Sequence, residues 1–365
     1  MSDTPAQLPS AAGDRATEVF VGHRELLFSV VYNLLGSVSD TEDVLQETWL
    51  AWARRVRQPD AEEIDNPRAY LVRIAVNQAL ARQATISRRR ETYIGPWLPE
   101  PLLTRTPEAL DSPQGARAVD AAESALRTES VSMALLVVLE TLTPLERAVF
   151  VLHEVFGYAH TEIAEILGRS PSAIRQLAHR AREHVQARRP RYQADPHLQQ
   201  QVTERFVAAA LGGDIAELMS LLAPDVTMWT DGGGKVRSAL RPVNGRDKVA
   251  RFLNGYATGR LPESLDIRYQ QVNGDPSAVV FSGDSPYAVM VMDLNPSNDQ
   301  ITDIYLVTNP DKLSRVRLDE SGEPTGAPRL APDAVPEQDP DPAPDQYPEQ
   351  ENAHPQQAAR RGDTP

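Results

Sequence analysis

The stretch YAHTEIAEILGRSPSAIRQLAHRAREHV, residues 158–185, carries the most specific structural signal in the sequence. Its first half predicts a short helix that ends at Gly168, and Ser170 followed by Pro171 predicts the start of a second helix. Apolar side chains at helical spacing give the two helices a buried side, made of Ile163, Ala164, Leu167, Ile174, Leu177 and Ala178. Helix, glycine turn and helix in this order predict a helix-turn-helix.

The outer side of the second predicted helix is polar and basic. It carries Ser172, Arg175, Gln176, His179 and Arg180, and the basic face continues through Arg182, Arg188 and Arg189. A recognition helix presents such groups to base edges and phosphates in the major groove of DNA. An ordinary helical hairpin with a solvated arginine face is the alternative interpretation, but the spacing, the glycine turn and the charge together favour DNA.

The net charge of −14 argues against DNA binding only when it is taken over the whole chain. Residues 319–365 hold 11 acidic and 3 basic side chains. By contrast, residues 68–90 hold six arginines and no acid, and residues 171–191 hold six arginines and one acid. Two basic islands in an acidic chain indicate localised contacts with a polyanion.

Residues 18–90 show apolar side chains at helical spacing. Asp40 is predicted to cap one helix of this stretch, because an aspartate at that position accepts hydrogen bonds from the free amides of the first turn. Asn66 followed by Pro67 predicts the start of another helix. Residues 1–17 lack this pattern and are expected to be disordered.

A proline-rich stretch, residues 93–129, interrupts the helices. It contains Trp97 and several leucines. A solvated linker rarely carries so much apolar surface, so part of it is expected to dock on another part of the protein. Helical signals return at about residue 118, and Thr143 followed by Pro144 predicts a further helix start.

Together these segments resemble the extracytoplasmic-function (ECF) sigma factors of the sigma-70 family. The match rests on DTEDVLQETW at residues 40–49, NPRAYLVRIAVNQAL at 66–80 and LTPLERAVF at 142–150. The resemblance implies two all-α sigma domains: region 2 at residues 18–92, and region 4, which holds the helix-turn-helix, at residues 130–192. It also implies a transcription initiation factor that binds core RNA polymerase and promoter DNA and responds to stress.

The resemblance further implies roles for particular residues. The helix with the acidic start is implied to bind the β′ clamp of the polymerase, through Asp40, Glu42, Asp43, Gln46, Glu47 and Trp49. The basic helix is implied to hold the melted −10 element, through Arg68, Arg73, Asn77, Arg82 and Arg88. Region 4 is implied to bind the β flap and to contact the −35 element, the latter through Ser172, Arg175, Gln176, His179, Arg180 and Arg182.

Past residue 192 the pattern changes. Residues 197–222 predict one or two helices around a pair of glycines, and β-prone runs follow at 226–230, 267–272, 278–281, 287–294 and 301–307. Helices followed by a curved sheet predict an α+β domain at residues 197–315. The acidic, proline-rich tail, residues 316–365, is expected to be disordered.

The whole chain resembles the group of ECF sigma factors that carry a C-terminal SnoaL-like domain, a cone-shaped α+β fold. The shared motifs are YIGPWLPEP at residues 93–101, DGGGK at 231–235 and NPDKL at 309–313. The resemblance implies that this domain contacts the linker and the sigma domains, through Trp97, Pro99, Asp231, Gly232, Gly233, Gly234, Lys235, Asn309, Pro310, Lys312 and Leu313. Such intramolecular regulation requires no separate membrane-bound anti-sigma partner.

A DNA-binding module fused to a small-molecule-converting enzyme is a second hypothesis, because some SnoaL-like proteins use an aspartate in catalysis. The candidate pocket residues are Asp231, Trp229, His197 and Tyr256, and a pocket there could instead hold an unknown small ligand. Catalysis needs a positioned base with a tuned pKa, which the sequence does not show. We therefore expect no catalytic residue and no cofactor. A plain helix-turn-helix repressor is the third hypothesis, but it needs no polymerase-binding helix.

Composition narrows the remaining possibilities. The sequence has no cysteine, which excludes disulfides and thiolate zinc sites, and we expect no metal site. No stretch approaches the roughly 18 uninterrupted apolar residues of a membrane helix. The first 15 residues lack the basic-then-apolar layout of a secretory signal. These observations favour a cytoplasmic protein without membrane association.

Overall fold

The structure is a computed structural model that describes residues 11–58, 64–104, 131–188, 195–318 and 324–325, apart from residues 261, 263, 296 and 298. The chain up to residue 327 belongs to one compact unit. Of the expected disordered segments, residues 1–10 and most of the tail lie outside the described residues, as do residues 105–130 of the linker region. Among the described residues, no helix combines the length and apolar character needed to cross a membrane.

The N-terminal part of the chain folds into three helices, α1 (Ala11–Leu35), α2 (Val38–Arg57) and α3 (Pro67–Glu91). The prediction of disorder through residue 17 is wrong for residues 11–17, because α1 already begins at Ala11. Tertiary contacts hold this first part of the helix: Ala16 is buried, and its carbonyl accepts a hydrogen bond of 2.9 Å from Trp52 Nε1. The start of α3 is as predicted, with Asn66 as its N-cap.

The start of α2 differs from the prediction. Ser37, and not Asp40, is the N-cap, and its Oγ accepts a hydrogen bond of 3.3 Å from the amide of Asp40. Gly36, with a φ of 67°, ends the preceding helix in a left-handed conformation that favours glycine. The chain then re-enters helix one residue after Ser37, which leaves Asp40 inside the first turn.

The helix-turn-helix prediction is confirmed. This part comprises α5 (Met133–Leu139), α6 (Pro144–Phe150), the π-helical turn η2 (Val151–Val155), α7 (His160–Leu167) and α8 (Pro171–Gln186). Thr143 and Glu146 form a capping box at the start of α6, and Ser170 caps α8. Gly168, with a φ of 61°, ends α7. The buried side of α7 includes Ile166, while Leu167 is only half-buried.

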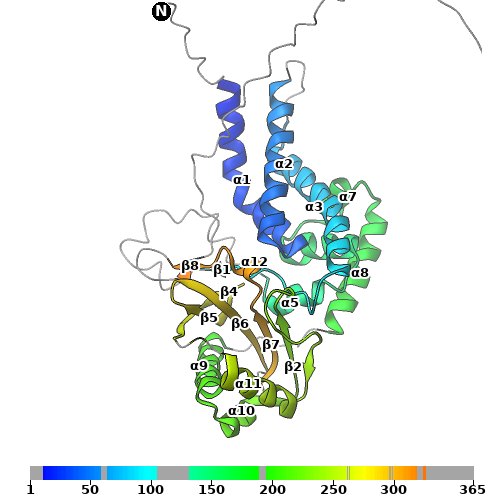
Figure 1. The fold of residues 1–365 in the computed structure, drawn as a ribbon. Coiled ribbons are helices and arrows are strands. Elements are labelled where there is room, and N and C mark those ends of the chain that lie inside the picture. Colours follow the sequence, from blue (N-terminus) through cyan, green and yellow to red (C-terminus); the bar gives the residue numbers. More distant parts are fainter. Residues whose placement is uncertain are drawn as a thin grey trace, which may run out of the picture. The chain divides into compact units, whose positions relative to one another are not determined.

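The N-terminal helices and the helix-turn-helix part share one hydrophobic core. Buried side chains of α1 to α3, such as Leu34 and Ile86, belong to the same cluster as Leu136 of α5 and Val149 of α6. Figure 1 shows α3 running beside α7 and α8. The two helical parts therefore pack on each other in this structure.

The C-terminal part is the α+β domain that the sequence predicts. Its elements are α9 (Pro196–Gly212), α10 (Ile215–Leu221), β2 (Leu222–Asp231), β3 (Val243–Asn244), α11 (Arg246–Arg260), β4 (Asp266–Val272), β5 (Asp275–Ser282), β6 (Ser285–Asn295), β7 (Gln300–Val307), α12 (Pro310–Leu313), β8 (Arg317–Leu318) and β9 (Pro324–Thr325). The short pair of strands β8 and β9 corrects the prediction of a tail disordered from residue 316, since antiparallel pairing orders these residues.

The main sheet has the strand order β1-β4-β5-β6-β7-β2-β3, where β1 is Leu103–Thr104 of the linker. The pairing of β2 with β7 is parallel, and the other pairs are antiparallel. The linker thus supplies an edge strand to the sheet of the C-terminal domain. Neither β1 nor β3 was predicted, because two-residue strands show no alternation of polar and apolar side chains.

The two faces of this sheet bury different partners. One face packs against α9, α10 and α11, with Phe206 and Met228 in its core (Figure 1). The other face packs against Leu98 of the linker and Met133 of α5. Since Leu135 and Leu136 of α5, two and three residues further on, belong to the core of the helical part, this helix joins the two cores. The sheet domain is therefore tied to the helical domains by apolar packing.

Candidate DNA-binding and partner-binding sites

The recognition helix α8 presents the predicted side chains outward. The exposed residues are Ser172, Arg175, Gln176, His179 and Arg180. Ile174 and Ala178 are buried and fix which side faces out. Arg180 Nε lies 3.1 Å from Glu146 Oε1, and Arg182, which is half-buried, donates to Glu154. The exposed row can donate and accept hydrogen bonds along one side of a helix, as major-groove recognition requires.

The residues predicted to hold −10 DNA fall into two groups on α3. Arg68, Arg73 and Arg88 are exposed. Asn77 and Arg82 have partners within the protein: Asn77 Nδ2 donates to Ile166 O of α7 at 3.2 Å, and Arg82 pairs with acids of α2. Contacts with α7 and α2 thus occupy two of the five predicted residues. The sequence could not indicate these contacts, because they depend on how the helices pack.

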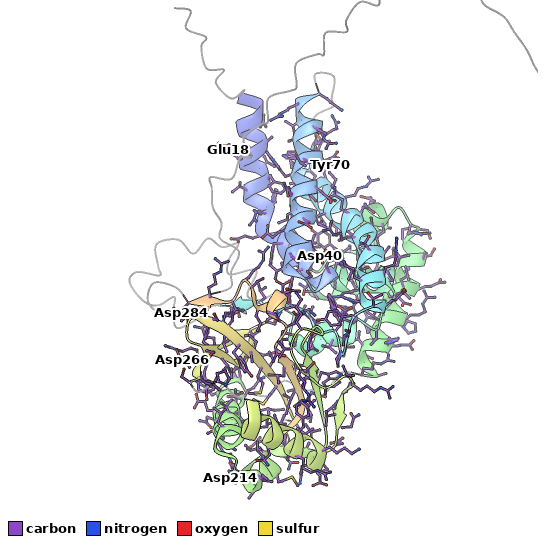
Figure 2. The ribbon with its side chains drawn as sticks, viewed as in Figure 1. Glu18, Asp40, Tyr70, Asp214, Asp266 and Asp284 are labelled. Carbon is purple, nitrogen blue, oxygen red and sulfur yellow. The ribbon has the colours of Figure 1, made fainter. Side chains whose placement is uncertain are left out.

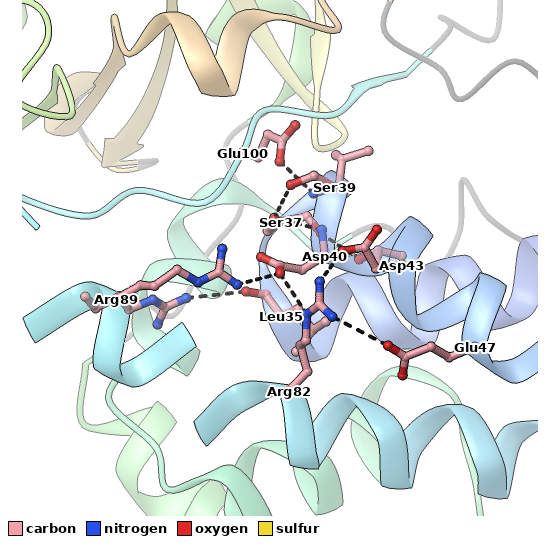
Figure 3. A network of polar contacts seen from close by, with 12 residues as sticks. Leu35, Ser37, Ser39, Asp40, Asp43, Glu47, Arg82, Arg89 and Glu100 are labelled. Atoms are coloured by element: carbon pink, nitrogen blue, oxygen red, sulfur yellow. Dashed lines mark hydrogen bonds and ion pairs between the residues drawn. The ribbon is translucent and has the colours of Figure 1, made fainter. Parts of the chain in front are cut away.

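Arg82 is the centre of an ion-pair network between α2 and α3 (Figure 3). Its guanidinium lies 3.0 Å from Asp40 Oδ1 and 3.6 Å from Glu47 Oε1, and it also pairs with Asp43. Arg89 reaches the same oxygen of Asp40 at 2.7 Å. Three acids predicted to face the polymerase therefore share arginines of the adjacent basic helix.

Asp40 differs from the other acids of α2 because it is buried, with 4% of its surface exposed. Burial raises its pKa, but the hydrogen bonds from Arg89 and Arg82 outweigh this effect and hold the pKa below the ordinary value. Glu42 is half-buried and pairs with Arg24 at 2.7 Å. Asp43, Gln46 and Glu47 are exposed, and Trp49 is half-buried. In this structure, then, Asp40 does not face solvent as a polymerase contact would.

The DGGGK and NPDKL motifs and the linker meet at the carboxylate of Asp231, which is completely buried. Lys312 Nζ lies 2.6 Å from Asp231 Oδ2, and the amide of Leu98 donates to that oxygen at 2.8 Å. The hydroxyl of Tyr93 donates to Oδ1 and accepts a hydrogen bond of 2.8 Å from Asn309 Nδ2. Residues predicted to form the regulatory contact are thus brought together around one ion pair.

Lys312 also holds the linker directly. Its ammonium donates to Leu98 O and lies 3.6 Å from the ring centroid of Trp97. The other cation over that ring is Arg90 of α3, at 4.8 Å. Burial lowers the pKa of Lys312 to about 8, and the nearby Asp231 opposes this shift. The indole of Trp97 therefore connects the helical part to the C-terminal domain through two cation–π contacts.

The glycine run forms a tight turn around this ion pair. Gly233 and Gly234 have φ values of 62° and 72°, in the left-handed region. The amide of Gly233 donates to Asp231 Oδ1 at 3.2 Å. Lys235, at the end of the run, pairs with Asp311 at 2.7 Å on the surface.

Replacing Gly232 by alanine is expected to destabilise the C-terminal domain by roughly 1–3 kcal/mol. A Cβ atom there would lie 2.3 Å from the carbonyl oxygen of Val236, so the turn would have to move. Urea unfolding measures the change. Gly22→Ala in α1 is the control: nothing lies within 4 Å of its Cβ position, and helix propensity predicts a gain of about 0.5–1 kcal/mol. Equal stability of Gly232→Ala and the parent chain would show that the turn is not tightly packed.

A second ion group, with Arg147 buried and Glu140 and Arg90 half-buried, joins the two helical parts. Glu140, at the end of α5, accepts hydrogen bonds from Arg147 at 2.7 Å and from Arg90 at 3.2 Å. Arg147 is 2% exposed, and its Nε donates to Asn33 O of α1 at 3.0 Å. Burial lowers the pKa of Arg147 to about 9 and that of Arg90 to about 10.

Several residues that contact the linker or join the two sigma regions were not predicted from the sequence. Tyr93 and Glu100 lie in the linker motif, but Arg90, Glu140 and Asn273 lie in no motif. Glu100, which is 5% exposed, accepts a hydrogen bond of 2.7 Å from the amide of Val38. The motif itself could have pointed to Tyr93 and Glu100; the other three have no signal in the sequence.

Three of the residues considered for a catalytic pocket, Asp231, Trp229 and His197, have side chains in the described part of the chain, and these three do not gather into a pocket. Asp231 is already bound by Lys312, Tyr93 and Leu98 and is not available as a base. Trp229 stacks on Tyr305 with ring centroids 5.1 Å apart, and His197 is exposed. The side chain of Tyr256 lies outside the described part of the chain.

Comparison with known families identifies the helical parts. Residues 19–89 match Sigma-70 region 2, and residues 132–185 match Sigma-70, region 4. These ranges correspond to α1–α3 and to α5–α8. The fold and the two matches define a sigma-70-type transcription factor.

The relatives are more specific. The chain is 38% identical over 315 residues to the ECF RNA polymerase sigma factor SigJ of Mycobacterium tuberculosis (strain ATCC 25618 / H37Rv), covering 84% of this chain and 96% of the relative. It is 29% identical to the probable ECF RNA polymerase sigma factor SigI of Mycobacterium tuberculosis (strain CDC 1551 / Oshkosh), covering 85% and 98%. The crystal structure of the Mycobacterium tuberculosis ECF sigma factor SigJ matches with a TM-score of 0.61 and 35% identity, over 81% of this chain and 97% of that one.

The chain therefore belongs to the ECF RNA polymerase sigma factors. It is an alternative sigma factor, which directs transcription by RNA polymerase from promoters, and it is not an enzyme. The predicted fold class, helical sigma domains followed by a C-terminal SnoaL-like α+β domain, is confirmed.

Proposed function

We propose that α2 binds the β′ clamp and region 4 the β flap of core RNA polymerase, while α3 holds the −10 element and α8 reads the −35 element. We further propose that the C-terminal domain regulates these contacts within the same chain. The protein acts in the cytoplasm, where polymerase and promoters are found, and needs no membrane-bound anti-sigma partner.

The observation that carries the DNA assignment is the exposed row on α8. Gln176 and Arg175 lie side by side in the first half of that helix, with buried Ile174 setting the orientation. Glutamine can make paired hydrogen bonds to adenine, and arginine to guanine, in the major groove. Arg88 and Arg73 on α3 supply positive charge for a second, separate contact with DNA.

Fewer residues of α2 are proposed to contact the polymerase than the sequence predicts. Asp43, Gln46 and Glu47 are exposed along one stretch of α2 and form the proposed contact. Asp40 is buried against Arg82 and Arg89, so its proposed role is to hold α2 on α3. Arg82 also pairs with Asp43 and Glu47, and a basic polymerase surface would compete with it for them.

The proposal of internal regulation is supported by a contact that already engages a predicted DNA-binding residue of α3. Asn77 donates to Ile166 O of region 4, so promoter melting by α3 requires that region 4 move away from it. Region 4 is attached to the C-terminal sheet through Met133 of α5. This attachment supports the proposal that the C-terminal domain influences how readily the two sigma regions separate.

Run-off transcription with core polymerase tests the DNA assignment. Gln176→Ala is expected to lower promoter affinity by about 5- to 150-fold, the cost of about 1–3 kcal/mol for one good base contact. Gln186→Ala is the matched control, because it is an exposed glutamine of the same helix, about 15 Å further along the axis. That variant is expected to behave like the parent chain.

Two results would contradict the proposal. Equal promoter affinity of Gln176→Ala and Gln186→Ala would remove α8 from −35 recognition. Failure of the parent chain to associate with core polymerase at low salt, or to direct it to any start site, would contradict the proposed function as a whole.

A further inference from the structure

The first turn of α2 is capped by a residue of the linker. Helix starts carry amides without intrahelical partners, and these favour a nearby acceptor or negative charge. Ser37 accepts from the amide of Asp40, but the amide of Val38 donates instead to Glu100 Oε2, at 2.7 Å. Burial raises the pKa of Glu100, while hydrogen bonds from the amides of Val38 and Ser39 oppose this shift. Figure 3 shows the Glu100 carboxylate at the start of the helix.

The backbone of Glu100 is fixed on both sides. Its amide donates to Gly36 O at 2.8 Å, at the turn that precedes α2. Its carbonyl accepts a hydrogen bond of 2.7 Å from the hydroxyl of Tyr32 in α1. With the side chain on Val38, these bonds hold Glu100 in one place relative to the α1–α2 turn.

Asn273 of the C-terminal domain completes this arrangement. Its Nδ2 donates to the Tyr32 hydroxyl at 2.7 Å, so the tyrosine relays the contact to Glu100. Its Oδ1 accepts from the amide of Leu102 at 3.2 Å, and its own amide donates to Leu102 O at 2.8 Å. Asn273 is 1% exposed and has a φ of 54°, between β4 and β5. This buried turn thus holds the linker at Leu102, two residues after Glu100, while Asp231 and Lys312 hold it at Leu98, two residues before.

We infer that Glu100 is a positioning residue for polymerase binding: its carboxylate fixes the start of α2, and Asn273 of the C-terminal domain fixes Glu100. Asp43, Gln46 and Glu47 follow within three turns of that start. Docking of the C-terminal domain therefore sets the position of the side chains that face the polymerase. This inference rests on the proposed role of α2.

The test measures the affinity of the full-length protein for core polymerase. Because the sequence has no cysteine, Lys248→Cys on α11 provides one exposed site for a fluorescent label. Glu100→Ala is expected to weaken binding about 5-fold, as loss of a helix cap does. Glu100→Gln keeps an acceptor oxygen for the Val38 amide and is expected to restore affinity to within about 2-fold of the parent.

Asn273→Gly tests the connection to the C-terminal domain. Glycine accepts the positive φ and removes only the side-chain amide. Like Glu100→Ala, this variant is expected to weaken polymerase binding. The variant that carries both changes is expected to bind polymerase no more weakly than the weaker-binding of the two single variants, because both changes act through one contact. If Glu100→Ala fails to fold, the comparison of Asn273→Gly with Glu100→Gln still tests the inference.

Controls separate the inference from the proposed function. Asp214 caps α10 in the C-terminal domain (Figure 2), and Asp214→Ala is expected to leave polymerase affinity unchanged. The double variant Gln46→Ala and Glu47→Ala tests the role of α2 itself. If that variant binds normally, the proposed polymerase surface is wrong. If it binds weakly while both Glu100→Ala and Asn273→Gly bind normally, only the positioning role is overturned.

Discussion

Lys312→Met is expected to lower the free energy of unfolding of the C-terminal domain by about 3 kcal/mol, because it leaves the carboxylate of Asp231 buried without a cation. Asp231 is completely buried, and Lys312 is 7% exposed. Methionine keeps much of the length of the lysine side chain, so the loss in free energy of unfolding comes from removing the charge and not from creating a cavity. The hydrogen bonds from Tyr93 and Leu98 remain, which places the loss at the lower end of the range for broken buried pairs.

Amide hydrogen exchange in the central strands, at Val291 and Tyr305, measures this loss. Lys235→Met is the matched control, since Lys235 pairs with Asp311 across an exposed contact and its loss should cost under about 1 kcal/mol. Combining Lys312→Met with Asp231→Asn removes both buried charges and should recover most of the stability. A cost for Lys312→Met as small as that of the control would show that the ion pair does not hold the linker site together.

Glu140→Ala is expected to lower the free energy of unfolding by a similar amount, roughly 3–5 kcal/mol, because it weakens the contact between the two sigma regions. Removal of this carboxylate leaves the guanidinium groups of Arg147 and Arg90 without their acid, and burial already lowers the pKa of both. Hydrogen exchange should rise in α6 and at the end of α3, which these arginines connect.

The control for this prediction is Glu217→Ala. Glu217 also pairs with an arginine, Arg205, at 2.6 Å, but the arginine side chain is 58% exposed. Its loss is expected to cost under about 1 kcal/mol. If Glu140→Ala leaves exchange in α6 as slow as in the parent chain, the regions must be held together by apolar packing alone. Faster exchange combined with tighter promoter binding would support the view that their packing restrains DNA binding.

The candidate sites could be predicted from the sequence to different degrees. The exposed row of α8 was predictable residue by residue, because helical periodicity alone decides which side chains point away from Ile174 and Ala178. The burial of Asp40 could not be predicted from the sequence. An acid at a helix start looks the same in sequence whether it faces solvent or, as here, the arginines of α3.

The contact between the linker and the C-terminal domain could be predicted in part. The motifs selected Asp231, Lys312 and Trp97, and the structure brings them together. The motifs could not show that Tyr93 donates to Asp231, or that Asn273, directly after β4, binds the same linker at Leu102. These bonds depend on how the linker enters the sheet as β1, and a two-residue strand leaves no pattern to recognise.

By itself, the sequence determined the helix-turn-helix, the long strands, the basic islands and the membership of the helical regions in their family. Caps, glycine turns and side-chain periodicity involve residues close together in the chain, so they can be recognised in the sequence. The tertiary structure alone decided that Asp231 pairs with Lys312, 81 positions away, and binds Tyr93, 138 positions away. It also decided that one helix, α5, serves two cores. Such contacts form because burial forces distant polar groups to find partners, and which partners meet depends on the whole fold.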